Sequence, residues 1–167
     1  GGVIQGNQDG RLWYRFLAGG QWRVYESDDG IAWALRQLPF GHAIVKTFVD
    51  AEGRLVAQTY ADGQYRLLTL SAAGEWQTGP IIPFSGLFMV ALDPDQSANV
   101  WVLERSEGTT LWRSQDGGQS YQPAAHPTQE VGCLGSTLVD RGLTIVADHA
   151  LVQGQESGTH HLCHIDV

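Results

Sequence analysis

The sequence predicts an all-β protein built from about four similar units of short strands, and three observations lead to this prediction. Related segments recur about every 43 residues along the 167-residue chain. Each unit contains short apolar runs separated by residues that favour tight turns. The composition, with 21 glycines, 6 tryptophans and 43% hydrophobic against 17% charged residues, suits many short strands joined by turns.

The repeat is clearest when the first two units are aligned. The tripeptide Gly-Arg-Leu at 10–12 recurs at 53–55, and Pro39-Phe40 recurs as Pro83-Phe84. The second spacing is one residue longer, so we expect an insertion near the end of the third strand. A period of this length with four strands per unit is typical of the blades of a β-propeller. The expected blades cover residues 1–41, 42–85, 86–129 and 130–167.

The expected strands are the apolar runs between hairpin turns such as Asp9-Gly10 and Asp62-Gly63. The first blade is expected to use residues 3–8, 12–17, 22–27 and 32–38, and the second blade 43–49, 55–60, 65–70 and 75–81. The third runs from 87 through 100–104 and 111–114 to 127. The fourth starts near Val131, continues over 143–147 and, after a polar loop at 153–158, ends with 160–166, which leaves it without a fourth strand.

The number of repeats raises a question of closure. The chain holds about 3.8 repeats, whereas closed propellers usually carry 4 to 8 blades. A compact four-bladed ring, a piece of a larger ring and a ring completed by further copies are the alternatives, and we favour a piece of a larger propeller. An open arc would expose the apolar face of a blade.

A turn motif follows the third strand of three repeats. Its pattern is Ser-x-Asp-x-Gly-x-x-aromatic: short Ser and Asp side chains accept hydrogen bonds from turn amides, Gly adopts a positive φ, and the aromatic residue packs on the sheet. The complete copy is Ser114, Asp116, Gly118 and Tyr121. A copy with one residue fewer is Ser27, Asp29, Gly30 and Trp33, and a degenerate copy is Ser71, Gly74 and Trp76.

This motif resembles the Asp-box, or BNR repeat, of the β-propellers found in sialidases, sortilin-like receptors and photosystem II assembly factors. The resemblance implies that the motif residues stabilise the fold and lie away from the usual ligand face. It also implies an extracellular, periplasmic or cell-surface location. We therefore expect the Ser and Asp residues of the motif to be structural rather than catalytic.

Composition argues against several functional classes. The net charge of −8, with Lys46 as the only lysine, argues against nucleic-acid binding, which depends on clustered positive charge. No apolar run approaches the length that a membrane-spanning helix needs. The Gly-Gly pairs lack a following helix that could hold a phosphate, and we expect no cofactor.

A candidate binding face is formed by the loops that connect the fourth strand to the next blade and the second strand to the third. Aromatic side chains beside a few polar groups could bind a sugar or a peptide segment. The alternative for Phe40 and Phe84 is that they recur because they pack one blade against the next. The candidate binding residues are Phe40, His42, Tyr60, Asp62, Phe84, Phe88, His126 and Glu130.

The sequence offers weak support for catalysis or metal binding. A glycosidase needs two facing carboxylates, and nothing in the sequence pairs Asp62 with Glu130. The segment His160-His161-Leu162-Cys163-His164 would present at most two metal ligands on either face of a strand, so we expect no metal site. Cys133 and Cys163 are expected two strands apart, beyond the usual reach of a disulfide, although irregular strand ends leave a bond open.

The function that we expect is a non-catalytic extracytoplasmic β-propeller scaffold that binds a protein or glycan partner or serves in complex assembly. One alternative is part of a sialidase-like glycoside hydrolase propeller. The other is a structural subunit whose copies associate blade to blade, as a homo-oligomer.

Overall fold

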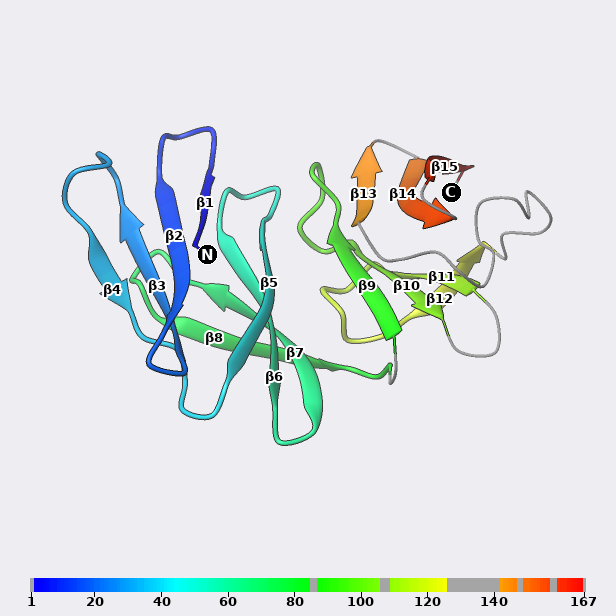
Figure 1. Ribbon diagram of the computed structural model, residues 1–167. Coiled ribbons are helices and arrows are strands. Elements are labelled where there is room, and N and C mark those ends of the chain that lie inside the picture. Colours follow the sequence, from blue (N-terminus) through cyan, green and yellow to red (C-terminus); the bar gives the residue numbers. More distant parts are fainter. Residues whose placement is uncertain are drawn as a thin grey trace. The chain divides into compact units, whose positions relative to one another are not determined.

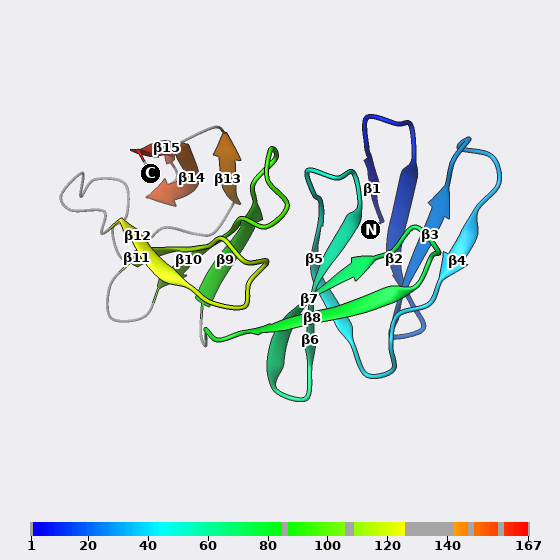
Figure 2. The same ribbon diagram turned by 180° about the vertical axis from the view of Figure 1, so that it is seen from behind.

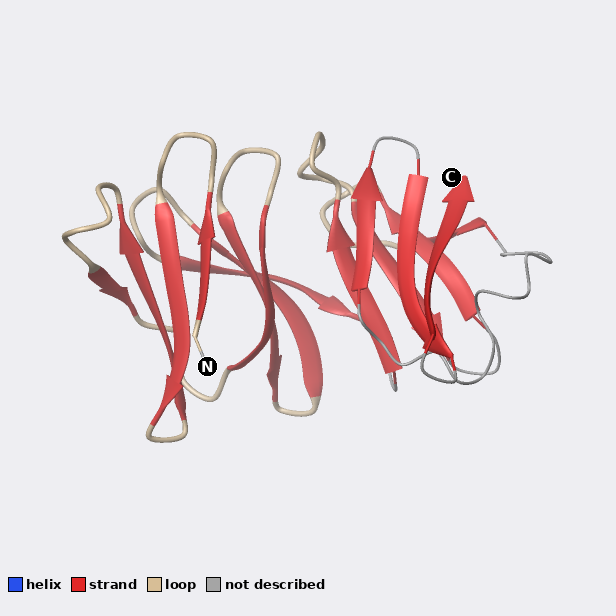
Figure 3. Cartoon of the chain, turned by 45° about the horizontal axis from the view of Figure 1, so that its top comes forward, coloured by secondary structure: helices blue, strands red, loops and turns tan. Residues whose placement is uncertain are grey.

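The structure is a computed structural model that describes residues 2–84, 87–105, 109–125, 142–146, 149–156 and 159–166. In this part of the chain all regular elements are strands, and no helix is present (Figures 1, 2 and 3). None of the described residues therefore forms a helix that could cross a membrane. The prediction of an all-β protein is confirmed.

The chain divides into two compact units, residues 1–82 and 83–167, and each unit contains two antiparallel sheets. In every sheet, strands that follow one another in the sequence lie side by side, so each sheet is a simple meander. The first sheet comprises β1 (Val3–Gly6), β2 (Leu12–Ala18), β3 (Gln21–Ser27) and β4 (Ala34–Arg36). The second comprises β5 (Ala43–Val49), β6 (Leu55–Ala61), β7 (Gln64–Leu70) and β8 (Trp76–Ile82).

The second unit continues the pattern. Its four-stranded sheet comprises β9 (Leu87–Leu92), β10 (Val100–Arg105), β11 (Thr109–Ser114) and β12 (Gln122–Ala125). The last described sheet has three strands, β13 (Gly142–Val146), β14 (His149–Glu156) and β15 (Thr159–Asp166). These bounds agree with the expected strands of the first three repeats to within a few residues.

The last repeat differs from the prediction. The polar segment at 153–158 was expected to be a loop, but its residues 153–156 belong to β14. They pair with β15 from Gln153 opposite Leu162 to Glu156 opposite Thr159. Backbone pairing along a long hairpin thus overrides the polar composition of the segment, because polar residues are compatible with a sheet wherever one face is solvated. The strand expected near Val131 lies outside the described residues, as does Cys133.

In the first unit the two sheets pack face to face around one apolar cluster. The first sheet contributes the buried Trp13 and Val24, and the second contributes Ile44, Leu55 and Leu70. Alternation along β2 points Trp13 toward this cluster, so Tyr14 and Phe16 point to the other side of the first sheet. We call that other side the outer face of the first sheet; it carries Ile4, Tyr14, Phe16, Tyr25 and Leu35.

In the second unit, one face of the sheet β9–β12 packs against β13. Ala91, Trp101, Leu103 and Leu111 form a buried cluster with Leu143 and Ile145 of β13, which extends the face-to-face packing to the next sheet. Large-to-small changes in such a cluster typically cost several kcal/mol. The same face of this sheet also carries the pocket described below.

A second repeated turn joins the first two strands of each four-stranded sheet. These hairpins begin at Asn7, Asp50 and Asp93. The side-chain Oδ1 of each accepts a hydrogen bond from the backbone N–H two residues later. It accepts a second from the N–H four residues later, or three residues later in the case of Asp93, and all these bonds measure 2.8–3.2 Å. The side chain thus replaces part of the turn's backbone bonding. These residues were not singled out in the sequence, although they recur at the same spacing as the rest of the repeat.

Candidate functional site

Three of the predicted binding residues, His42, Tyr60 and Asp62, lie at one end of the second sheet. Tyr60 pairs with Ala43, directly after His42, and the Tyr60 ring lies 4.8 Å from that of Tyr65. Asp62 occupies the β6–β7 turn with a positive φ of 51°. Such a φ is tolerated by Asp more readily than by most residues, so a turn requirement already explains Asp62.

The two phenylalanines that recur in the sequence have different surroundings. Phe40 is fully exposed, so it does not pack one sheet against another in this structure. Phe84 lies in the second unit, where its ring is within 5.3 Å of the rings of Trp112 and Tyr121 and 6.4 Å of Phe88. Phe40 therefore remains a candidate binding residue, and Phe84 and Phe88 belong to an aromatic cluster. His126 and Glu130 lie outside the described residues.

His42 is held in place by its own sheet. Its Nδ1 lies 3.0 Å from Thr59 Oγ1, and the Thr59 side chain is fully buried. One ring nitrogen is thereby committed to a hydrogen bond, which leaves Nε2 for any other contact.

The turn after β3 has the hydrogen bonds that the box motif predicts. The Ser27 hydroxyl donates to Asp29 Oδ1 at 3.0 Å and accepts from the Gly30 N–H at 2.9 Å. Asp29 Oδ1 also accepts from the N–H groups of Ile31 and Ala32 at 2.7 and 2.8 Å. These bonds stabilise the carboxylate and lower the pKa of Asp29, the backbone donors contributing most.

The turn after β11 repeats this network with one more residue. The buried Ser114 hydroxyl donates to Asp116 Oδ1 at 2.7 Å and accepts from the Gly118 N–H at 2.8 Å. The Ser120 hydroxyl and N–H donate to the same carboxylate at 2.6 and 2.9 Å. The pKa of Asp116 is held far below its usual value, first by the Ser120 hydrogen bonds. The carboxylate is thus an ionised part of the turn.

The turn after β7 differs from the other two. Position 73 is alanine, so no carboxylate is available, and Ser71 uses its N–H and C=O in backbone bonds with Glu75 and Gly74. Its hydroxyl accepts one bond, from the Glu75 N–H at 3.2 Å. This is the hydrogen-bond pattern of the turns at Asn7 and Asp50, so the degenerate copy predicted at Ser71, Gly74 and Trp76 forms a turn of that second kind.

Tyr121 is the aromatic residue of the second box, and the pH at which its hydroxyl ionises tests how deeply this turn is buried. Its hydroxyl is buried without a hydrogen-bond partner among the described residues, and burial followed by the Asp116 charge raises its pKa to about 12. Since the folded pKa exceeds the ordinary value of 10.0, we expect stability to be lost as the pH rises from about 10 toward 12. Tyr121→Phe is expected to remove this loss without lowering stability at neutral pH. Phenolate absorbance, compared between wild type and variant, checks it; a Tyr121 that ionises near 10 in the folded protein would contradict it.

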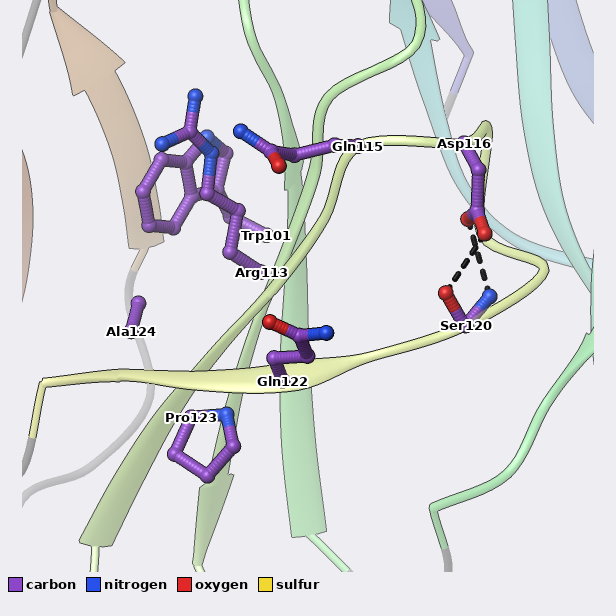
Figure 4. A pocket seen from close by; sticks show the side chains of 8 residues that line it. All are labelled: Trp101, Arg113, Gln115, Asp116, Ser120, Gln122, Pro123 and Ala124. Atoms are coloured by element: carbon purple, nitrogen blue, oxygen red, sulfur yellow. Dashed lines mark hydrogen bonds between the residues drawn. The ribbon is translucent and has the colours of Figure 1, made fainter.

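A polar pocket of about 430 Å³ lies on the sheet β9–β12 (Figure 4). It is bounded by strands β10, β11 and β12 and by the box turn. Figure 4 shows the Arg113 guanidinium stacked over the Trp101 indole, with Gln115 and Gln122 beside them. The lining residues are Trp101, Arg113, Gln115, Asp116, Ser120, Gln122, Pro123 and Ala124.

Two hydrogen-bond donors of this pocket have no acceptor among the residues that the structure describes. The Arg113 Cζ lies 4.9 Å from the centre of the Trp101 ring, a cation–π arrangement. Within the described chain, Trp101 Nε1 and Arg113 Nε are buried and have no acceptor. Buried donors without acceptors are uncommon and costly, so this pair is a candidate for ligand binding. Neither residue was predicted; an Arg opposite a Trp on neighbouring strands has no recognisable sequence signature.

No group of three or more His, Cys, Asp or Glu side chains that could hold a metal ion is found among the described residues. The side chains of His160, His161, Cys163 and His164 belong to β15 but lie outside the described set, so their prediction stays untested.

No protein-family model matches this sequence, and no curated protein matches it. Among solved structures, the chain is similar to TolB from Acinetobacter baumannii, with a TM-score of 0.66 at 12% sequence identity. The similarity covers 98% of this chain and 41% of the TolB chain. It supports a β-propeller fold. At this identity the likeness concerns the fold alone; the Asp-box superfamily remains a resemblance of motifs, and the chain spans less than half of TolB.

Proposed function

We propose that the chain is a non-catalytic β-propeller scaffold of the Asp-box type that binds an apolar protein surface through the outer face of its first sheet. The observation that carries this proposal is the exposure of apolar side chains there. Ile4 is 64% exposed and Leu35 is 48% exposed, and they flank the half-buried rings of Tyr14, Phe16 and Tyr25. Contiguous apolar surface of this kind marks interaction sites.

In the second sheet, the face that corresponds to this outer face is covered. Ala57 and Thr59 occupy, in the repeat, the positions of Tyr14 and Phe16, and both are fully buried where the second sheet meets the first. The first sheet thus covers this face in the second blade, and the equivalent face of the first blade carries the exposed side chains named above.

The box aromatic residues show the same contrast. Trp76 packs into the cluster between the first two sheets, and its Nε1 lies 3.4 Å from the Arg36 carbonyl oxygen of the first sheet. Its equivalent Trp33 is 37% exposed and donates to the carbonyl of Gly30 in its own turn. The partner that fits is therefore a sheet with an apolar face like the Trp13 and Val24 side of the first sheet.

The proposed absence of catalysis is supported by the carboxylates of the two box turns. Asp29 and Asp116 are each held by hydrogen bonds within their turns, which keeps them ionised and unsuited to donating a proton. The Asp-box resemblance supports an extracytoplasmic location. A glycosidase remains the alternative; hydrolysis of a glycoside panel that is lost in Asp62→Asn or Glu130→Gln would favour it.

Sedimentation across a range of protein concentrations tests the proposal. A second copy is the simplest available probe, because it presents the same exposed apolar outer face. We expect wild-type mass to rise above 18.2 kDa with concentration. Leu35→Asp, on the outer face, should suppress this rise; Val45→Asp, at a residue of the second sheet with the same 48% exposure, should not. Association that is equal in both variants would overturn the proposal.

A further inference from the structure

The first and third sheets place a tryptophan at the same point of the blade but give it different partners. Trp13 and Trp101 are each the second residue of the second strand, and each is opposite the residue that precedes the box serine. In the first sheet that opposite residue is Glu26; in the third it is Arg113. One blade thus has an acid where the other has a base.

In the first sheet the tryptophan is satisfied by the acid. Trp13 Nε1 donates to Glu26 Oε1 at 3.2 Å, and Glu26 Oε2 accepts from Arg36 Nε at 2.6 Å. Glu26 is only 7% exposed, so a buried carboxylate joins an indole N–H to a guanidinium. This arrangement satisfies every member of the group.

In the third sheet an indole N–H and a guanidinium again lie together, but no carboxylate among the described residues accepts hydrogen bonds from them. Trp101 is 2% exposed, and its Nε1 has no acceptor among the described residues; the same holds for Arg113 Nε. Both side chains line the pocket of about 430 Å³, beside the amide groups of Gln115 and Gln122. The pocket therefore lies beside a tryptophan whose Nε1 has no acceptor in the described chain, whereas the equivalent Trp13 in the first sheet donates to Glu26.

We propose that this pocket binds the carboxylate group of a ligand, which accepts hydrogen bonds from Trp101 Nε1 and the Arg113 guanidinium. An indole N–H and a guanidinium are donors only, so the complementary group is an acceptor, and a carboxylate matches the guanidinium in charge and geometry. This inference is independent of the outer face of the first sheet.

The charge of Asp116 sets the expected strength of binding. Its carboxylate lines the same pocket and is ionised, which opposes a second anion. Its oxygens accept hydrogen bonds from Ser114, Gln119 and Ser120, so it is already occupied and does not compete for Arg113. We expect weak binding of a single carboxylate, strengthened by ligand atoms that contact the glutamines.

Acetate is the probe, and the indole N–H resonance of Trp101 is the readout, assigned by its absence in Trp101→Phe. We expect a saturable downfield shift of this resonance with acetate, and none with acetamide or with sodium chloride at equal ionic strength. Arg113→Gln should weaken acetate binding by about tenfold or more, since hydrogen bonds to charged groups are strong. Arg15→Gln is the matched control: Arg15 also lies over a tryptophan, Trp22, and its Nε also lacks an acceptor in the described chain, but it does not line the pocket.

Arg113→Glu provides a second variant if Arg113→Gln folds poorly. It recreates the Trp13–Glu26 pair, so the Trp101 indole proton should be shifted downfield without ligand and acetate should have no effect. A blocked tripeptide with a central Glu, compared with its Gln counterpart, then separates an acidic side chain of a polypeptide from a small free carboxylate; binding by either supports the proposal. A Trp101 resonance that ignores both acetate and the Glu peptide, or that moves equally with acetamide or in Arg113→Gln, would overturn it.

Discussion

Ser114→Ala is expected to lower the free energy of unfolding by about 2–3 kcal/mol, because it removes the hydroxyl that accepts a hydrogen bond from a buried N–H of the turn. Ser114 is 1% exposed, and its hydroxyl links the Asp116 carboxylate to the Gly118 N–H. Alanine has the same backbone preferences in a strand end but no oxygen. The Gly118 N–H, itself buried, would then lose its acceptor. Urea unfolding of wild type and variant measures the difference.

Ser71→Ala is the matched control for this effect. Ser71 occupies the corresponding turn of the second sheet, but it is half-buried and its hydroxyl accepts a single long bond of 3.2 Å. We expect a loss below about 1 kcal/mol. Equal losses in the two serine variants would show that the box hydrogen bonds are not what stabilises the turn after β11.

Glu26→Ala is expected to cost about 3 kcal/mol, because it removes the common acceptor of several buried or half-buried donors. Trp13 Nε1 and Arg36 Nε both donate to this carboxylate, and Arg11 Nη1 lies 3.4 Å from it. Without it, an indole N–H and a guanidinium remain unpaired beside the cluster that joins the first two sheets. Thermal or urea unfolding checks the loss.

Asp28→Ala provides the comparison for Glu26. Asp28 also pairs with Arg11, at 2.9 Å, but its side chain is 78% exposed. Exposed ion pairs contribute little, so we expect a change below about 1 kcal/mol. A larger loss for Asp28→Ala than for Glu26→Ala would contradict the account of a buried acceptor in the first sheet.

Much of the architecture was predictable because the repeat imposes the same local chemistry in each blade. The strands of the first three repeats and the turns at Asp9-Gly10 and Asp62-Gly63 were predicted from turn residues between apolar runs. The fourth repeat was less predictable, since the polar residues of β14 resemble a loop when read without their partner strand. The turn at Ser71 was misassigned because one alanine in place of an aspartate changes the hydrogen bonding while the spacing stays the same.

The candidate sites were less visible in the sequence than the fold. The residues of the β6–β7 end, including Tyr60 and Asp62, were predicted as binding residues from their position in the blade. Trp101 and Arg113 were missed because their importance depends on cross-strand register and on the absence of an acceptor, neither of which a single sequence displays. A comparison of Trp13 with Trp101, which occupy equivalent positions of two blades, would have drawn attention to this pair, because the residue opposite Trp13 is an acid and the residue opposite Trp101 is a base.

The central claim is that the outer face of the first sheet is an apolar docking surface. Binding of a dye that fluoresces on exposed apolar surface tests this claim most directly. At a concentration where the protein is monomeric, we expect wild type and Val45→Asp to bind the dye alike and Leu35→Asp to lose most of the signal. Fluorescence that is the same in all three proteins would show that the rings of Tyr14, Phe16 and Tyr25 do not form an open docking face.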